Sequence, residues 1–293
     1  MKNFTIRELE NFSKVKAHTI RIWEQRYSVF NPSRSEGNFR RYNLEEVKLL
    51  LHISLLLKNN FKISSLAKMN INELEQKLDD LHTEDTIRSK AINDMIVCMF
   101  SSDIEEFEDV LDTCVHLYDI DITIQKIIIP FLERVQLLSY NDHSNDVHFA
   151  VTAIRKKIIL GIEKANPRSL IQKSALLFLE EGEHYDLMLL YTAYILKSSG
   201  LRVLYLGTNV PTGNLKAISV TKKPDFLLTY IPQKHKFKMH NLLPILDKHL
   251  PGSIFFVVNC ENSKSEDDIQ NNLKFIHYNS VPFLFNQQPV LNC

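Results

Sequence analysis

The fold is decided by the stretch Thr5–Tyr42, TIRELENFSKVKAHTIRIWEQRYSVFNPSRSEGNFRRY. It opens on a capping box, because the Thr5 hydroxyl can accept the Glu8 amide while the Glu8 carboxylate reaches back to the Thr5 amide. Apolar residues then recur at helical spacing, and the spacing resumes from about Ala17 to Gln25. The sequence therefore predicts two short helices with a tight turn between them, the arrangement of a helix-turn-helix.

A hairpin is expected after the second helix. Pro32 lacks an amide and restricts Asn31, so the helix cannot continue. Residues 34–42 are typical of two strands with Glu36-Gly37-Asn38 at the tip. The return strand, Phe39–Tyr42, alternates aromatic and basic residues, and its Arg side chains can lie along phosphates. A second capping box, Asn43 with Glu46, predicts the start of a third helix.

The segment Thr19–Tyr27, TIRIWEQRY, followed by Pro32-x-Arg34 and Arg40-x-Tyr42, resembles the MerR family of transcription regulators. The resemblance covers about residues 4–73. It depends on a helix, a proline, an arginine of the hairpin and a tyrosine that follow one another in this order. Two positions differ from the family pattern, since Ser28 replaces the usual glycine and Lys16 replaces the usual Ser or Thr cap. The resemblance implies a winged helix-turn-helix DNA-binding domain in residues 1–80.

The second helix is expected to enter the major groove of DNA, and the hairpin is expected to hold the phosphate backbone. Thr19 and Arg21 are the expected base or phosphate contacts of that helix, while Trp23 anchors it in the core. The predicted DNA-binding residues are His18, Thr19, Arg21, Arg26, Tyr27, Arg34, Arg40, Arg41 and Tyr42.

Charge supports a polyanion partner at one end of the chain. The 293 residues carry no formal net charge, yet residues 1–70 hold 13 Lys or Arg against 6 Asp or Glu. No apolar run reads as a signal peptide or a membrane span, so a cytoplasmic protein is expected. The four cysteines are widely spaced, which favours neither a zinc site nor a disulfide framework.

Residues 84–166 have the periodicity of a four-helix bundle. The expected helices are Ile92–Phe100, Ile104–Tyr118, Ile124–Leu138 and Val147–Ile162, with caps at residues 101–103 and at Asp121. Pro130 lies inside the third segment, where it either starts or kinks a helix.

Residues 172–293 alternate short apolar runs with helical ones, which predicts a doubly wound parallel sheet of the flavodoxin-like kind. The expected strands are Ala175–Leu179, Arg202–Leu206, Phe226–Tyr230, Ile254–Val258 and Phe275–Tyr278. The expected helices are Leu187–Ser199, Thr212–Thr221, Met239–His249 and Glu266–Leu273.

This order of domains resembles the CarH/LitR type of light-sensing regulators, whose last two modules hold cobalamin. The strongest local match is residues 181–187, EGEHYDL, followed by residues 199–207, SGLRVLYLG. The resemblance implies an axial histidine in the first of these loops, and His184 is the candidate cofactor ligand.

The positions that the resemblance assigns to the cofactor differ here. Tyr185 stands at the histidine position, one residue from His184, and Met188 stands where a glycine lets the corrin tail pass. The remaining differences are Val258-Asn259-Cys260-Glu261 in the region of a Gly-Gly step, Ser139 or Tyr140 for a Trp, and Val147-His148-Phe149 for Glu-His-Phe. A degenerate motif without bound cobalamin is therefore expected, and metal binding by His143 and His148 is disfavoured against ordinary helix histidines.

The expected function is sequence-specific transcriptional regulation of the MerR type, with the C-terminal half serving assembly or sensing. The alternative is a cobalamin-dependent light or ligand sensor, and a corrinoid methyltransferase module is disfavoured because it needs no DNA-binding domain. No catalytic constellation stands out, so an enzyme is not expected. The expected partners are a pseudo-palindromic duplex DNA and further copies of the chain, with RNA polymerase as another candidate and no membrane.

Overall fold

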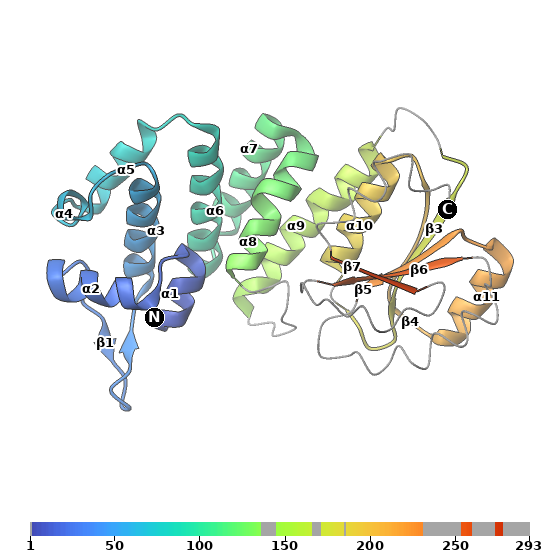
Figure 1. Cartoon of the computed structure of the whole chain (residues 1–293), viewed down its shortest axis with the longest axis horizontal. Helices are drawn as coiled ribbons and strands as arrows, with labels where there is room; N and C mark the ends of the chain where they lie inside the picture. The colour runs from blue at the N-terminus through green and yellow to red at the C-terminus, as the bar shows by residue number, and fades with distance from the viewer. Residues whose placement is uncertain are drawn as a thin grey trace. The chain divides into compact units, whose positions relative to one another are not determined.

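The structure is a computed structural model that describes residues 2–135, 145–165, 171–184, 186–230, 253–259 and 273–277. Its contacts divide the chain into two compact units (Figure 1). The first comprises Met1–Leu137 with Asp142–Ile154, and the second comprises Leu138–Asn141 with Arg155–Cys293. The parallel sheet lies in the second unit, and each unit is described by itself.

The first unit begins with the predicted helix-turn-helix and hairpin. Its elements are α1 (Ile6–Ser13), α2 (Ala17–Tyr27), β1 (Ser33–Arg34), β2 (Arg40–Arg41), α3 (Leu44–Lys58), α4 (Ile63–Leu66) and α5 (Ile71–Asp79). Both predicted capping boxes are present, at Thr5 with Glu8 and at Asn43 with Glu46, and Asn70 with Glu73 forms a third at the start of α5. Local hydrogen bonds that the sequence encodes therefore fix where these helices begin.

The core of the first unit runs without a break from the helix-turn-helix into the helices that follow. Phe4 packs edge-on against Phe12 and Phe100, with ring centroids 5.8 and 4.7 Å away. Phe100 belongs to α6 (Glu84–Ser101), which also contacts α3. Lys2 adds a hydrogen bond of 2.7 Å from Nζ to the carbonyl of Phe100. The helix-turn-helix is thus packed on α6.

The helical segment after α6 consists of α7 (Ile104–Thr123), η1 (Ile124–Ile128), α8 (Ile129–Arg134) and α9 (Asn145–Lys164). Asp103 caps α7 as predicted, because its carboxylate accepts the Glu106 amide at 3.2 Å. The cap predicted at Asp121 is wrong: the helix breaks at Asp119, with φ 60° and ψ 167°, and Asp121 lies inside the part that follows. Pro130 is the second residue of α8, which continues directly from the π-helical η1.

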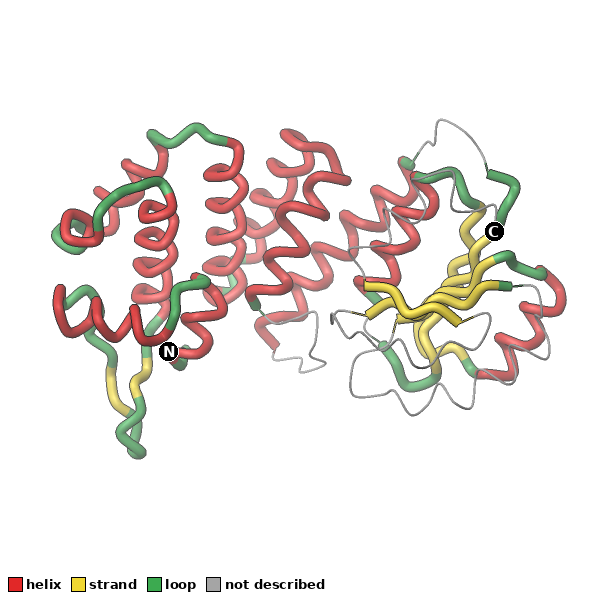
Figure 2. Tube along the Cα trace, viewed as in Figure 1, coloured by secondary structure: helices red, strands yellow, loops and turns green. Residues whose placement is uncertain are grey.

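The second unit contains a five-stranded parallel sheet, as predicted (Figure 2). Its strands are β3 (Ser174–Glu180), β4 (Arg202–Val210), β5 (Phe226–Tyr230), β6 (Ile254–Asn259) and β7 (Leu273–His277), in the spatial order β4-β3-β5-β6-β7. This is the order of flavodoxin-like sheets. The strands β3 and β5 pair through buried apolar residues, as strands covered on two faces require.

Two helices connect the first three strands: α10 (Leu187–Ser198) and α11 (Thr212–Lys222). Because β4 and β5 flank β3 on opposite sides, right-handed crossovers put these helices on opposite faces of the sheet (Figure 1). β4 is longer than predicted and reaches Val210, with register shifts against β3 between Leu177 and Glu180. The predicted helix Met239–His249 lies outside the described residues, as does Glu266–Leu273 except for Leu273, which begins β7.

We expect His52 to make the first unit sensitive to acid. His52 is 4% exposed on α3, its Nδ1 has no hydrogen-bond partner in the described part, and burial lowers its pKa to about 4. At a pH between the ordinary histidine pKa and about 4, His52 therefore binds a proton in the unfolded chain but not in the folded chain. As the pH falls through this window, His52 should remove roughly 3 kcal/mol of folding free energy.

The measurement is urea unfolding of wild type and His52→Leu at neutral and at mildly acidic pH. Burial raises the pKa of Asp94 to about 6, which acts in the opposite direction, but Asp94 is present in both proteins and cancels in their difference. His52→Leu should lose less stability in acid than wild type. Parallel pH curves for the two proteins would contradict the assignment.

Candidate nucleic-acid interface

Helix α2 buries one face and leaves a basic face in solvent. Ile20 is fully buried and Trp23 is 8% exposed, which agrees with the predicted anchoring of the helix. On the other side His18, Arg21 and Arg26 are exposed, and Thr19 is half-buried with its Oγ1 3.3 Å from His18 Nε2. The arrangement offers donors along one helix face, as a helix in a major groove requires.

The N-terminus of α2 is capped by a residue of α1. Glu10 Oε2 accepts the Ala17 amide at 3.1 Å, and Glu10 Oε1 lies 3.1 Å from Lys16 Nζ. The bond from the Ala17 amide, and then the one from Lys16, lower the pKa of Glu10. Lys16 itself gives no side-chain cap, so Glu10 does what Ser or Thr does in the family pattern.

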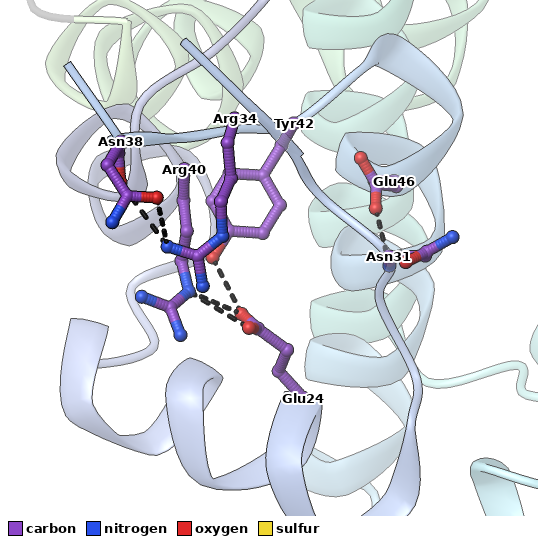
Figure 3. A network of polar contacts seen from close by, with 7 residues as sticks. All are labelled: Glu24, Asn31, Arg34, Asn38, Arg40, Tyr42 and Glu46. Carbon is purple, nitrogen blue, oxygen red and sulfur yellow. Dashed lines mark hydrogen bonds and ion pairs between the residues drawn. The ribbon is translucent and has the colours of Figure 1, made fainter. Parts of the chain in front are cut away.

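A single carboxylate connects α2 to the hairpin of β1 and β2, which we call the wing (Figure 3). Glu24 accepts the Arg40 Nε–H at 2.9 and 3.1 Å and the Tyr42 hydroxyl at 3.1 Å. Arg40 and Tyr42 are two apart on the return strand and thus share one face of it. Burial and the neighbouring Glu24 carboxylate raise the pKa of Tyr42, and the same carboxylate raises the pKa of Arg40.

The wing places two arginines opposite each other. Arg34 pairs with Arg40 across the strands, a like-charged pair that costs energy unless each member finds a partner. Arg40 finds Glu24, and Arg34 donates to Asn38 Oδ1 at 2.8 Å (Figure 3). Arg34 stays exposed and Arg41 is half-buried. The wing tip carries Phe39, which is 70% exposed.

The structure corrects the role expected for Tyr42. Its side chain is fully buried, and its hydroxyl is bonded to Glu24, so it does not face DNA. Its backbone also pairs with Phe4, with N···O distances of 2.8 and 2.9 Å. Tyr42 is a packing residue that holds the wing to the core. It is excluded from solvent because its backbone pairs with Phe4 at the buried end of the return strand.

The other predicted contacts fall into two groups on this surface. His18, Arg21, Arg26 and Arg34 are exposed, while Thr19, Tyr27, Arg40 and Arg41 are half-buried. Arg26 lies over the Tyr27 ring at 5.9 Å. Sequence reasoning missed Glu10, Glu24 and Phe39. The one signal for Glu24 was the Arg40-x-Tyr42 pattern, which presents a cation and a hydroxyl on one face of a strand.

A second candidate site lies at the carboxyl ends of β3 and β4, where such sheets bind ligands. The loop after β3 is tied to β4, since Asn209 Oδ1 accepts the Gly182 amide at 2.8 Å and the Asn209 amide donates to the Glu183 carbonyl at 3.0 Å. His184 is exposed in this loop, and Asp186 is held by Arg155 at 2.8 Å. The segments that follow β5 and β6, residues 231–252 and 260–272, lie outside the described residues.

Two side chains of α10 bear on whether this region could hold cobalamin. Met188 is 1% exposed in the first turn of α10, so its side chain fills the space that the resemblance assigns to a glycine. Tyr191 is 3% exposed and packs in the same core. Tyr185, Cys260, Ser139, Tyr140 and His143 lie outside the described residues.

Metal and thiol chemistry find no support in the described residues. Among them no group of three or more metal-binding side chains gathers. Cys98 and Cys114 are free and buried, and burial raises their pKa values to about 12 and about 11, which keeps both thiols protonated. Within the same residues, no helix is long and apolar enough to cross a membrane.

Residues 4–70 match the profile of the family described as MerR HTH family regulatory protein. The N-terminal domain is a MerR-type helix-turn-helix. The match coincides with the segment that α1, α2, the wing, α3 and α4 build, as the sequence predicted.

Two curated relatives extend the similarity beyond this MerR-type domain. The chain is 25% identical over 227 residues to the HTH-type transcriptional repressor CarA of Myxococcus xanthus, covering 75% of this chain and 73% of that protein. It is 24% identical over 268 residues to the repressor CarH of the same organism, covering 86% and 87%. The chain is homologous to these repressors and is not an enzyme, as predicted.

Among solved structures, the chain is similar to the monomethylamine corrinoid protein of Methanosarcina barkeri. The TM-score is 0.56 at 12% identity, over 70% of this chain and 99% of that one. At this identity the likeness shows the fold alone: helices followed by a parallel-sheet domain like that of cobalamin-binding proteins.

Proposed function

We propose that this chain is a sequence-specific transcriptional regulator that reads DNA with α2 and holds the backbone with the wing. The observation that carries the proposal is the exposed basic face of α2 beside a wing that Glu24 fixes to it. Arg21 and Thr19 are the base-reading candidates, with His18 beside them, and Arg34, Arg40 and Arg41 are the phosphate contacts. Arg26 and Tyr27 complete this surface as a winged helix-turn-helix.

One such domain covers a half-site, so we propose that two or more copies bind a pseudo-palindromic operator. The homology to CarA and CarH supports repression as the outcome. RNA polymerase at the same promoter is a further proposed partner. The protein would act in the cytoplasm, where that promoter lies.

For the C-terminal half we propose a flavodoxin-like scaffold that serves assembly or sensing without cobalamin. The buried Met188 and the hydrogen bonds that join the loop after β3 to Asn209 of β4 support this proposal. The alternative is a cobalamin-dependent light or ligand sensor, which the homology to CarH and the fold favour. His184 is the residue on which that alternative depends.

We expect Arg21→Ala to weaken operator binding strongly while leaving the fold intact, because Arg21 is exposed and a good base contact contributes about 1–3 kcal/mol. The operator would first be selected from random duplexes with the wild-type protein, and affinities would be measured by gel shift. Arg40→Ala should also weaken binding, and the salt dependence should become less steep.

The matched control for Arg21→Ala is Lys126→Ala, which removes an exposed cation from η1, away from the proposed interface. Its affinity for the operator should equal that of wild type. Wild-type affinity in Arg21→Ala would show that the DNA-facing side has been misplaced.

The cofactor proposal predicts that the purified protein remains colourless. It would be incubated in the dark with adenosylcobalamin or methylcobalamin, desalted, and examined by visible absorption, with His184→Ala treated in parallel. Corrin bands that stay with wild type and are lost in His184→Ala would establish the alternative. The absence of bands from a protein that still binds DNA supports a cofactor-free scaffold.

A further inference from the structure

Helix α2 exposes one large apolar side chain among the residues that the proposed function turns towards DNA. Ile22 is 48% exposed, although it lies between Arg21 and the buried Trp23. A single exposed isoleucine is common on protein surfaces and indicates no function by itself. The position of Ile22 on the helix is what points to a function.

The exposed residues of α2 surround Ile22 at helical spacing. His18 lies four residues before Ile22 and Gln25 lies three residues after it, so the three side chains share one face of the helix. All three are exposed, whereas Ile20 is fully buried. Arg21 is also exposed and lies four residues before Gln25. Ile22 therefore lies within the exposed face, with polar side chains on each side of it.

The core of the domain does not account for Ile22. The buried side of α2 is formed by Ile20 and Trp23, which are 0% and 8% exposed. Isoleucine is β-branched, which lowers helix propensity slightly, and the exposed part of Ile22 leaves apolar area in water. Contact with an apolar group of a ligand would remove this area from water and would thereby favour binding.

The major groove of DNA offers one such group to a helix. Base edges there present hydrogen-bond donors and acceptors, and thymine adds its C5 methyl group. An aliphatic side chain forms no hydrogen bond, so a methyl contact is the readout that Ile22 can make. Arg21 and Gln25 can instead bond to guanine and to adenine. The exposed face of α2 thus combines polar donors with one apolar contact.

We propose that Ile22 is a specificity-determining residue that reads a thymine through its C5 methyl group. The inference rests on the proposed function, since it requires α2 to lie in the major groove. It goes beyond that function in naming a base and the atom of it that is recognised. The operator should therefore carry a thymine opposite Ile22 in each half-site.

The test replaces thymine by deoxyuridine, which lacks only the methyl group, at one position of the selected operator at a time. Wild type should bind about fourfold more weakly when the thymine opposite Ile22 is replaced in one half-site, since one methyl-sized contact is lost. Ile22→Ala should bind the unmodified operator roughly tenfold more weakly, because both half-sites lose the contact. The same variant should not distinguish thymine from deoxyuridine at this position. Ile22→Val keeps a branched side chain and should still distinguish them.

The matched control is Ile104→Ala, which makes the same change at a residue that is 50% exposed on α7, outside α2 and the wing. It should bind as wild type does and should keep the response to deoxyuridine. Wild type that binds its operator but responds to none of the deoxyuridine replacements would overturn the inference and leave the proposed function standing. An Ile22→Ala protein that keeps the wild-type response would also overturn it. Failure of wild type to select any operator would overturn the proposed function, and this inference with it.

Discussion

The arrangement of the DNA-reading surface depends on the carboxylate of Glu24. A wing of two two-residue strands has too few backbone hydrogen bonds to hold its own orientation. Glu24 supplies that orientation from α2 by accepting from Arg40 and from the buried hydroxyl of Tyr42. Glu24 is 15% exposed, so the ion pair is less screened than a surface pair. Helix and wing therefore present their basic side chains as one surface.

Behind the DNA-reading surface, side-chain contacts also join helices that are distant along the chain. Phe4, Phe12 and Phe100 join the helix-turn-helix to α6, and Asn93 joins α3 to α8 through Leu51 and Arg134. The MerR-type domain therefore shares a continuous core with the helices that follow it in the first unit. The helices after α5 therefore contact α1 and α3 of the DNA-binding domain directly.

The sequence predicted what local chemistry encodes. The two predicted capping boxes, the break at Pro32 and the apolar strands β3 and β5 each depend on residues within a few positions of one another. It did not predict partners that are distant along the chain: Glu10 as the cap of Ala17, Glu24 for Arg40, or Asn93 for Arg134. Tyr42 was misplaced for the same reason, because only the pairing with Phe4 and Glu24 reveals that its strand face is buried. The break at Asp119 has no signal in the local sequence that we can identify.

The most direct test of the account is a double-mutant cycle between Glu24 and Arg40, read out as affinity for the selected operator. If the Glu24 carboxylate orients the wing, Glu24→Gln and Arg40→Gln should each weaken binding, and the double variant should be little weaker than Arg40→Gln alone. The coupling free energy should then be about 1 kcal/mol or more. Glu45→Gln, at an exposed site on α3, should combine with Arg40→Gln additively. Additive effects of Glu24→Gln and Arg40→Gln would contradict a wing held by this carboxylate.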